Sequence, residues 1–373
     1  MIIAFVLDQF DVLNNGTVAS ARRFVSNLRE LGHTVRILTT GTKSDDKDMY
    51  LLPEKNVPLA TYFARKQGMV FSKIDKGKIR EFLTGADVVH FYMASPLARA
   101  VELMAREMNV PCIAAFHIQP ENITYIIHVK NLPGTTKFFY WFLYQYFFKR
   151  FRDIHCPTEF IARELRNNGY GKATLHVISN GVSETFVPRE PLPHENINVL
   201  MMGRLSPEKR QDLLIEAVRR SKYAAKIQLI LTGYGPLLEK YKELSKDLPH
   251  KPIFGFFPEE KLTEIIRSAD IYVHASEVEI ESVACMEAFS SGLVPIIANS
   301  PTSATPKFAL DERSLFKPGD ASDLAGKIDY WIEHPEEKAE MGKRYAAQGD
   351  KFRVMDSVKQ MVEVYKTLKP GRI

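Results

Sequence analysis

The stretch NVLMMGRLSPEKRQDLLIEAVRRSK, residues 198–222, decides the fold, because a strand and a helix follow one another in it across a short loop. The same succession continues to residue 298, with further strands such as IQLILTG (227–233) and DIYVHAS (270–276). Right-handed crossovers turn such a series into a parallel sheet with helices on both faces. Ligands of these sheets bind beyond the carboxyl ends of the strands, so the loops after strands are the places to look for chemistry.

The N-terminal half repeats this pattern. Residues 1–8, MIIAFVLD, form an apolar run that is typical of a strand buried on both faces of a parallel sheet. A helix is expected over 19–32, after a loop that includes NNGT, and Gly32 ends it. The proline-rich stretch 188–197 breaks the alternation and is interpreted as a linker. We therefore expect an α/β protein with two Rossmann-like domains and a cleft between them: 1–187, 188–355, and a final helix, 356–373, that packs back toward the N-terminal domain.

Composition excludes several classes of protein. Hydrophobic residues make up 45% and charged residues 25% of the 373 residues, as in soluble globular proteins. The three cysteines lack metal-ligand spacing and favour a reducing compartment. The N-terminus lacks the basic region of a signal peptide, and no apolar run has the length of a membrane span. The expected location is the cytoplasm, including the inner face of the plasma membrane as a peripheral protein. The net charge of +5 permits an anionic substrate or membrane surface.

Two cations stand beside the strand–helix junction of the opening stretch. Arg204 comes just after the strand, and Lys209 just before or within the first turn of the helix. Cations are disfavoured at a helix N-terminus unless an anion is bound there. A diphosphate would reverse the cost, because both cations and the helix N-terminus would converge on it. The alternative is that both are solvated surface charges.

Glycines and aromatic residues follow other strands. Gly16, Gly233 and Gly235 lie in loops after strands, where backbone N–H groups can approach phosphate, although ordinary turns explain them equally. The motif FGFFP, which contains Phe254, is either a wall on which a base stacks or simple core packing. His117 follows the apolar strand CIAAF and precedes a polar loop, which makes it an active-site candidate, whereas a lone histidine is more often structural.

Four glutamates crowd the segment EVEIESVACMEAFSSGLVPIIA, residues 277–298. Three of them, at 277, 279 and 281, precede a helix, and Glu287 lies inside it. Because a carboxylate accepts two hydrogen bonds from neighbouring hydroxyls, Glu279 and Glu287 would suit the two sugars of a nucleotide sugar. Two surroundings remain open for Glu281, namely solvent and substrate.

Together these motifs resemble retaining glycosyltransferases of the GT-B fold, in glycosyltransferase family four (the group-one type), and among them bacterial members that form glycolipids. The resemblance is carried by the motif GRLSPEK and by the pair Glu279 and Glu287, which seven residues separate. The motifs NNGT, HVISNG and LTGYGP add to it. It implies two Rossmann-like domains facing a central cleft and a nucleotide-diphosphate-sugar donor. We expect no required cofactor, and we assign no metal, because no DxD-like acidic pair stands where it would chelate one. In place of the usual Gly-Phe-Gly after the first glutamate, this chain has Ile280, Glu281 and Ser282.

The resemblance also implies residue roles. Arg204 and Lys209 would grip the diphosphate, and His117 would lie near the anomeric carbon. Glu287 would hold the ribose and Glu279 the hydroxyls of the transferred sugar. The residues expected in chemistry are His117, Glu279, Arg204 and Lys209. Those expected to bind the donor are Gly16, Thr17, Asn180, Gly203, Arg204, Lys209, Gly233, Gly235, Phe254, Glu279, Ser282, Val283 and Glu287.

Two segments of the N-terminal half combine aromatic residues with cations and contain no acid, residues 137–152 and 60–73. Such segments suit the headgroup region of an anionic membrane, and the alternative is the buried face of a helix. They favour a lipid acceptor such as diacylglycerol or a ceramide. The expected donor is UDP-glucose or UDP-galactose. Two rival interpretations remain: an enzyme acting on a soluble or polyprenyl-linked saccharide, and a non-catalytic nucleotide-sugar-binding protein.

Overall fold

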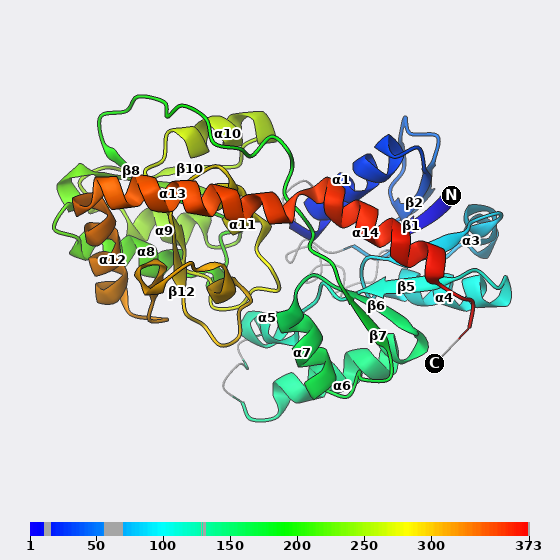
Figure 1. The fold of residues 1–373 in the computed structure, drawn as a ribbon. Helices are drawn as coiled ribbons and strands as arrows, with labels where there is room; N and C mark the ends of the chain where they lie inside the picture. The colour runs from blue at the N-terminus through cyan, green and yellow to red at the C-terminus, as the bar shows by residue number, and fades with distance from the viewer. Residues whose placement is uncertain (11–15, 56–69, 128, 130–131, 372–373) are drawn as a thin grey trace. The chain divides into compact units, whose positions relative to one another are not determined.

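The computed structural model describes residues 1–10, 16–55, 70–127, 129 and 132–371 (Figure 1). The chain forms two compact units. Unit 1 comprises Met1–Thr124, His128–Asn180 and Val354–Ile373, and unit 2 comprises Tyr125–Ile127 and Gly181–Arg353. The domain limits expected from the sequence, at 187/188 and 355/356, stay a prediction. No helix within the described ranges is long and apolar enough to cross a membrane.

Unit 1 is built on a seven-stranded parallel sheet with the order β3-β2-β1-β4-β5-β6-β7. Four of its strands, β1, β4, β5 and β6, are almost entirely buried, and for β1 the apolar run of residues 1–8 predicted this. The strands are β1 (Ile2–Val6), β2 (Thr34–Thr40), β3 (Met49–Leu52), β4 (Val88–Phe91), β5 (Cys112–Ala115), β6 (Asp153–Cys156) and β7 (Thr174–Val177).

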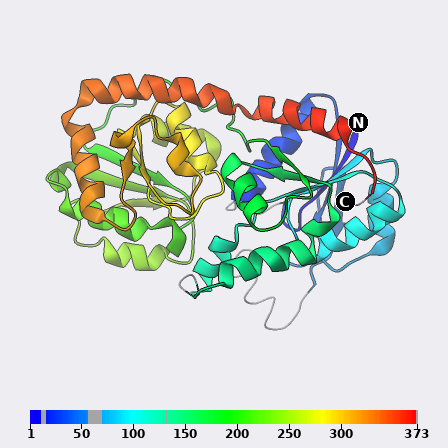
Figure 2. The same ribbon diagram turned by 60° about the horizontal axis from the view of Figure 1, so that its bottom comes forward.

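Helices flank this sheet on both faces. The C-terminal helix α14 lies alongside α1, and the two share a core with the sheet (Figures 1 and 2). The hydroxyl of Tyr365 on α14 lies 2.6 Å from Nδ1 of His90 in β4, which ties the end of the chain to the first half. The helices are α1 (Gly16–Glu30), α3 (Lys76–Leu83), α4 (Pro96–Glu107), α5 (Pro120–Ile126), α6 (Thr135–Tyr146), α7 (Glu159–Asn167) and α14 (Val354–Thr367).

The first helix begins earlier than the sequence indicated. We expected it from residue 19, with Gly16 in the preceding loop, but α1 starts at Gly16. Glycine tolerates the first turn of a helix, because a helix interior is where it is costly. Gly16 and Thr17 therefore lie in the first described turn of α1.

Unit 2 contains a six-stranded parallel sheet with the order β10-β9-β8-β11-β12-β13. Its strands are β8 (Ile197–Met202), β9 (Ile227–Thr232), β10 (Ile253–Gly255), β11 (Ile271–His274), β12 (Pro295–Ala298) and β13 (Leu315–Phe316). Its helices are α8 (Gln211–Arg220), α9 (Leu238–Leu244), α10 (Glu259–Arg267), α11 (Val283–Ser290), α12 (Ala321–Glu333) and α13 (Pro335–Gly349). The expectation of an α/β chain with two parallel-sheet, Rossmann-like units is confirmed.

The register of unit 2 brings the predicted loops to one edge of the sheet. Met202 pairs with Thr232, and Thr232 pairs with Gly255, so β8, β9 and β10 end side by side. On the other side of β8 lies β11, which ends at His274. The loops that begin after Met202, Thr232 and His274 therefore leave from the same carboxyl edge.

Candidate active site

Glycines let two loops of unit 2 touch at this edge. Gly233 has a φ of +142°, and a Cβ there would lie 2.0 Å from the carbonyl oxygen of Gly203. At Gly235 a Cβ would lie 2.2 Å from the carbonyl oxygen of Leu205. Any larger residue would force the loops apart, so close backbone packing alone requires both glycines.

The loop after β8 places the two predicted cations. Arg204 follows Gly203, and its carbonyl oxygen accepts a hydrogen bond of 2.9 Å from Nε2 of Gln211 in α8. Lys209 ends a 3₁₀ turn (Pro207–Lys209), and Arg210, with a φ of +59°, separates it from α8. The side chain of Arg210, the N-cap residue, makes no capping hydrogen bond at the start of α8. The N–H groups of Leu213 and Leu214 donate to the carbonyl oxygen of Arg210. Those of Gln211 and Asp212 remain for water or an anion, next to both cations.

Glu279 is a nearly buried carboxylate with one oxygen in an ion pair and the other without a hydrogen-bond partner among the described residues. Its Oε1 forms an ion pair with Nζ of Lys209 and lies 3.2 Å from Nε2 of His274, at an angle that does not complete a hydrogen bond. Within the described residues its Oε2 has no hydrogen-bond partner. Burial alone would raise the pKa of Glu279, but the adjacent Lys209 and His274 lower it to about 2. The carboxylate is therefore charged at neutral pH, with one oxygen available to a ligand.

The loop that carries Glu279 is fixed through its backbone. The carbonyl oxygen of Glu279 accepts from the N–H of Ala304 at 2.9 Å, and that of Glu277 accepts from Ser300 Oγ at 2.6 Å. The side chain of Glu277 forms an ion pair with Arg210. Glu277 is thus a structural clamp between this loop and the start of α8.

The remaining acids of the segment lie inside the protein. Glu281 is only 1% exposed, so the alternative that placed it in solvent is wrong. Ser282, with a φ of +70°, caps α11, where its Oγ accepts from the N–H of Cys285. Val283 opens the helix, and Glu287 is 6% exposed one turn later. Glu279, Glu281 and Glu287 thus surround the N-terminal turn of α11 in sequence, and all three are buried.

Phe254 is partly buried and packs against the core of unit 2, as the alternative of simple core packing expected. Phe256, by contrast, is half exposed. A base-stacking role for Phe254 stays a prediction.

Unit 1 holds the other predicted residues. Asn180 Oδ1 accepts a 2.7 Å hydrogen bond from Ser20 Oγ of α1. His117 follows β5, is 9% exposed, and packs against Tyr92 with the ring centroids 4.4 Å apart and the rings tilted by 35°. Within the described residues its Nε2 has no hydrogen-bond partner. Nothing in the sequence singled out Asp8, which is buried after β1 and whose pKa burial raises to about 6.

His117 belongs to a cluster of three buried histidines, His90, His117 and His155. The rings of His90 and His117 each lie 5.6 Å from that of His155. Burial lowers the pKa of His155 to about 4 and those of the other two well below their usual range. Nε2 of His155 lies 2.7 Å from the carbonyl oxygen of Ile178, which can only accept, so this nitrogen carries the proton.

We expect acid to destabilise unit 1 through this cluster. Since the pKa of His155 is lower in the folded than in the unfolded state, its stabilising contribution is complete above about pH 6.5 and is lost as the pH falls toward the folded value, at up to about 1.4 kcal/mol per pH unit. Denaturant unfolding at neutral and mildly acidic pH would show a smaller loss of stability in His155→Gln than in the parent. Equal losses in the two proteins would exclude this origin.

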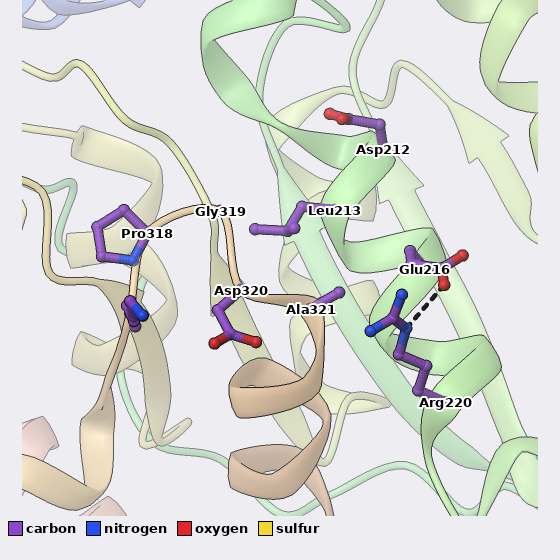
Figure 3. A pocket seen from close by; sticks show the side chains of 9 residues that line it. Asp212, Leu213, Glu216, Arg220, Pro318, Gly319, Asp320 and Ala321 are labelled. Atoms are coloured by element: carbon purple, nitrogen blue, oxygen red, sulfur yellow. Dashed lines mark hydrogen bonds and ion pairs between the residues drawn. The ribbon is translucent and has the colours of Figure 1, made fainter.

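A pocket of about 450 Å³ lies elsewhere in unit 2. Asp212, Glu216 and Arg220 of α8 face it, opposite residues 317–321, and Arg220 bonds to Glu216 (Figure 3). None of the predicted site residues lines it. It therefore gives no support to the donor site. No group of three or more histidines, cysteines or carboxylates in the described part of the chain is arranged to hold a metal ion.

Sequence reasoning missed His274 and Arg210. His274 looked like an ordinary residue of the strand DIYVHAS, and no role was assigned to Arg210. The available signal was position, since each stands at a strand end or a helix start on the carboxyl edge of the sheet.

Two family models match the chain. The model described as Glycosyltransferase Family 4 matches residues 14–186, and the one described as Glycosyl transferases group 1 matches residues 182–348. The alpha-monoglucosyldiacylglycerol synthase of Streptococcus pneumoniae is 25% identical, over 80% of this chain and 71% of its own length.

Two solved structures are also similar. Anabaena HepE in complex with UDP and glucose matches with a TM-score of 0.75 and 15% identity, over 99% of this chain and 100% of its own. The catalytic domain of cholesterol-alpha-glucosyltransferase from Helicobacter pylori is 47% identical over 42% of this chain and 99% of its own, with a TM-score of 0.39.

Proposed function

The chain belongs to the group 1 glycosyltransferases of the GT-B fold, and from this membership we propose that it moves a hexose from a nucleotide-diphosphate sugar to a membrane lipid, with retention of configuration. The donor that we propose is UDP-glucose or UDP-galactose. The carrying observation is Glu279, a buried and charged carboxylate whose Oε2 has no partner within the described residues. Lys209 neutralises the carboxylate through Oε1, and Oε2 can accept hydrogen bonds from sugar hydroxyls.

The diphosphate has its own candidate site beside Glu279. Arg204, Lys209 and the uncapped N-terminus of α8 lie along one short segment. An ammonium has three donors, so Lys209 can keep its ion pair with Glu279 while it contacts a phosphate oxygen. Glu287, inside α11, is the proposed ribose ligand.

The proposed reaction breaks the bond between the anomeric carbon and the diphosphate oxygen and forms one from that carbon to the acceptor oxygen on the same face. The acceptor proton passes to the departing diphosphate. Arg204, Lys209 and the α8 N-terminus would stabilise the negative charge that develops on that leaving group, which is where preorganised charge lowers a barrier most. His117, whose ring is neutral at neutral pH, is the residue that we propose to act near the anomeric carbon.

The proposal of a lipid acceptor rests on α6 and on the diacylglycerol synthase among the relatives. Phe138, Trp141 and Phe142 are 53%, 55% and 44% exposed, and they lie on one face of α6 at helical spacing. Lys137 and Lys149 are exposed near its two ends. An exposed aromatic face with flanking cations suits the interface of an anionic membrane, where this protein would be peripheral.

The structure modifies the expectation for residues 137–152. Arg150 does not face outward: its Nη1 donates to the carbonyl oxygens of Gln145 and Tyr146 at the end of α6, and it lies 3.9 Å from Glu102. Phe147, Phe148 and Phe151 are buried. The segment thus combines an outward aromatic face with an inward one. Residues 60–69 of the second segment lie outside the described residues.

We expect Phe138→Gln, Trp141→Gln and Phe142→Gln together to abolish most membrane binding. A large apolar side chain gains roughly 1.5–3 kcal/mol when it is fully buried, so three side chains that enter the bilayer interface only partly should together contribute on the order of 3 kcal/mol of binding free energy, which the triple variant would lose. Flotation with phosphatidylglycerol vesicles measures this loss. Lys137→Gln with Lys149→Gln should cost about 1 kcal/mol each, and less as salt rises.

The matched control replaces exposed leucines away from α6, Leu31→Gln and Leu244→Gln, and should float like the parent. A parent protein that never floats, at any salt concentration, would exclude the lipid-surface proposal. It would favour the soluble or polyprenyl-linked saccharide as the acceptor instead.

The function itself is tested by supplying UDP-glucose and UDP-galactose with vesicles that contain diacylglycerol, ceramide or cholesterol, three lipids with different hydroxyl groups. Mass spectrometry of the extracted lipids would show a glycosylated product of at least one. Donor hydrolysis without acceptor separates an enzyme from a non-catalytic binding protein. UDP binding without turnover of any donor would support that rival.

A further inference from the structure

His274 and Tyr272 form a buried polar pair within β11. His274 is 1% exposed and Tyr272 is fully buried, and the Tyr272 hydroxyl lies 3.2 Å from Nδ1 of His274. Polar side chains at such a position cost free energy unless they have partners. The other ring nitrogen of His274, Nε2, has as its near neighbour Oε1 of Glu279, 3.2 Å away. The pair therefore points from the core of unit 2 toward the proposed sugar ligand.

We propose that His274 is a positioning residue: with Lys209 it fixes Oε1 of Glu279, so that Oε2 is held toward the hydroxyls of the transferred sugar. The inference rests on the proposed function, because it needs Glu279 to bind that sugar. If the Tyr272 hydroxyl donates to Nδ1, then Nε2 carries the ring proton and faces an acceptor. In this structure the angle at Nε2 is too unfavourable for a hydrogen bond to Glu279. Hydrogen bonds of active sites are often poorly aligned without substrate and tighten when it binds.

The surroundings make this role specific to Glu279. The backbone on both sides of the carboxylate is already fixed, through Ala304 and through the Glu277 clamp. What remains to be set is the rotation of the Glu279 side chain itself. The side chain of Lys209 is 21% exposed and would also contact the diphosphate, so Lys209 alone cannot fix the rotation of the Glu279 side chain. A rigid ring from the core supplies the second contact.

The test compares His274→Leu, His274→Gln and Tyr272→Phe with the parent. Leucine fills the site but cannot donate, whereas the Gln amide can replace Nε2. Since a hydrogen bond to a charged group is at stake, His274→Leu should lower kcat/KM for the preferred UDP-sugar by about 10- to 100-fold, with the Kd of UDP nearly unchanged. His274→Gln should restore most of the rate, and Tyr272→Phe should lie between.

Val273→Ala is the matched control, because Val273 is fully buried in the same strand and its side chain alternates to the other face. It should lower stability without changing the balance between UDP binding and turnover. The inference is overturned if His274→Leu turns over the donor like the parent. It is also overturned if UDP binding and turnover fall together and Gln restores neither. A parent that neither binds UDP nor uses either UDP-sugar overturns the proposed function, and this inference with it.

Discussion

Arg204→Ala should lower transfer from UDP-glucose by about a hundredfold or more, because a preorganised cation at a leaving group is worth roughly 2–4 kcal/mol of transition-state stabilisation. Initial rates and circular dichroism would be measured together, and the fold should be unchanged. The matched control is Arg220→Ala at the far end of the same helix, α8, which should react like the parent. Near-normal turnover of Arg204→Ala would remove it from the diphosphate site.

Lys209→Met should have an effect of similar size but of mixed origin. The ion pair with Glu279 means that the substitution removes both a phosphate contact and the counterion of a buried carboxylate. Combining Lys209→Met with Glu279→Gln should therefore be less damaging than the product of the single effects. Strictly additive effects on kcat/KM would show that the two side chains act independently.

Glu279→Gln and Glu287→Gln should affect different steps, and this is the second large effect. If Glu287 holds the ribose, its loss weakens ground and transition states alike, so the Kd of UDP should rise by about tenfold or more. If Glu279 holds the transferred sugar, its loss should lower kcat by about a hundredfold and leave UDP binding nearly intact.

Calorimetric titration with UDP, which lacks the sugar, separates the two roles. Glu216→Gln, an acid on α8 that faces the separate pocket, is the control and should change neither quantity. Weaker UDP binding in Glu279→Gln together with normal binding in Glu287→Gln would reverse the assignments.

The alternation of strands and helices was predictable from sequence because each apolar run is local. So was the edge of the sheet at which the glycine and arginine loops meet, since parallel strands end on one side. The family resemblance and the GT-B architecture are confirmed by the two family models and the structural match. The site residues assigned from that resemblance stay predictions, although the structure gathers most of those in unit 2 around β8, β9 and α11.

The sequence did not predict contacts between side chains that are far apart along the chain. Lys209 and Glu279 are 70 positions apart and meet because β8 lies beside β11. Glu281 looked equally suited to solvent and substrate, and only the fold shows that it is buried. Arg150 looked like part of a basic surface, but its side chain donates a hydrogen bond to a backbone carbonyl at the end of α6. For Lys209 and Glu281 the deciding contacts come from tertiary packing, which local pattern does not encode, whereas Arg150 turns back on carbonyl oxygens four and five positions before it.

One measurement tests the central claim most directly: the anomeric configuration, by NMR, of the glycolipid made from UDP-glucose and diacylglycerol-containing vesicles. The account predicts that the parent protein forms an α-glucosyl lipid, because the donor is α-linked and its configuration is retained. It also predicts that Arg204→Ala forms very little of this product. A β-linked product would contradict the proposed reaction, and the absence of any glycolipid in the presence of donor hydrolysis would contradict the lipid acceptor.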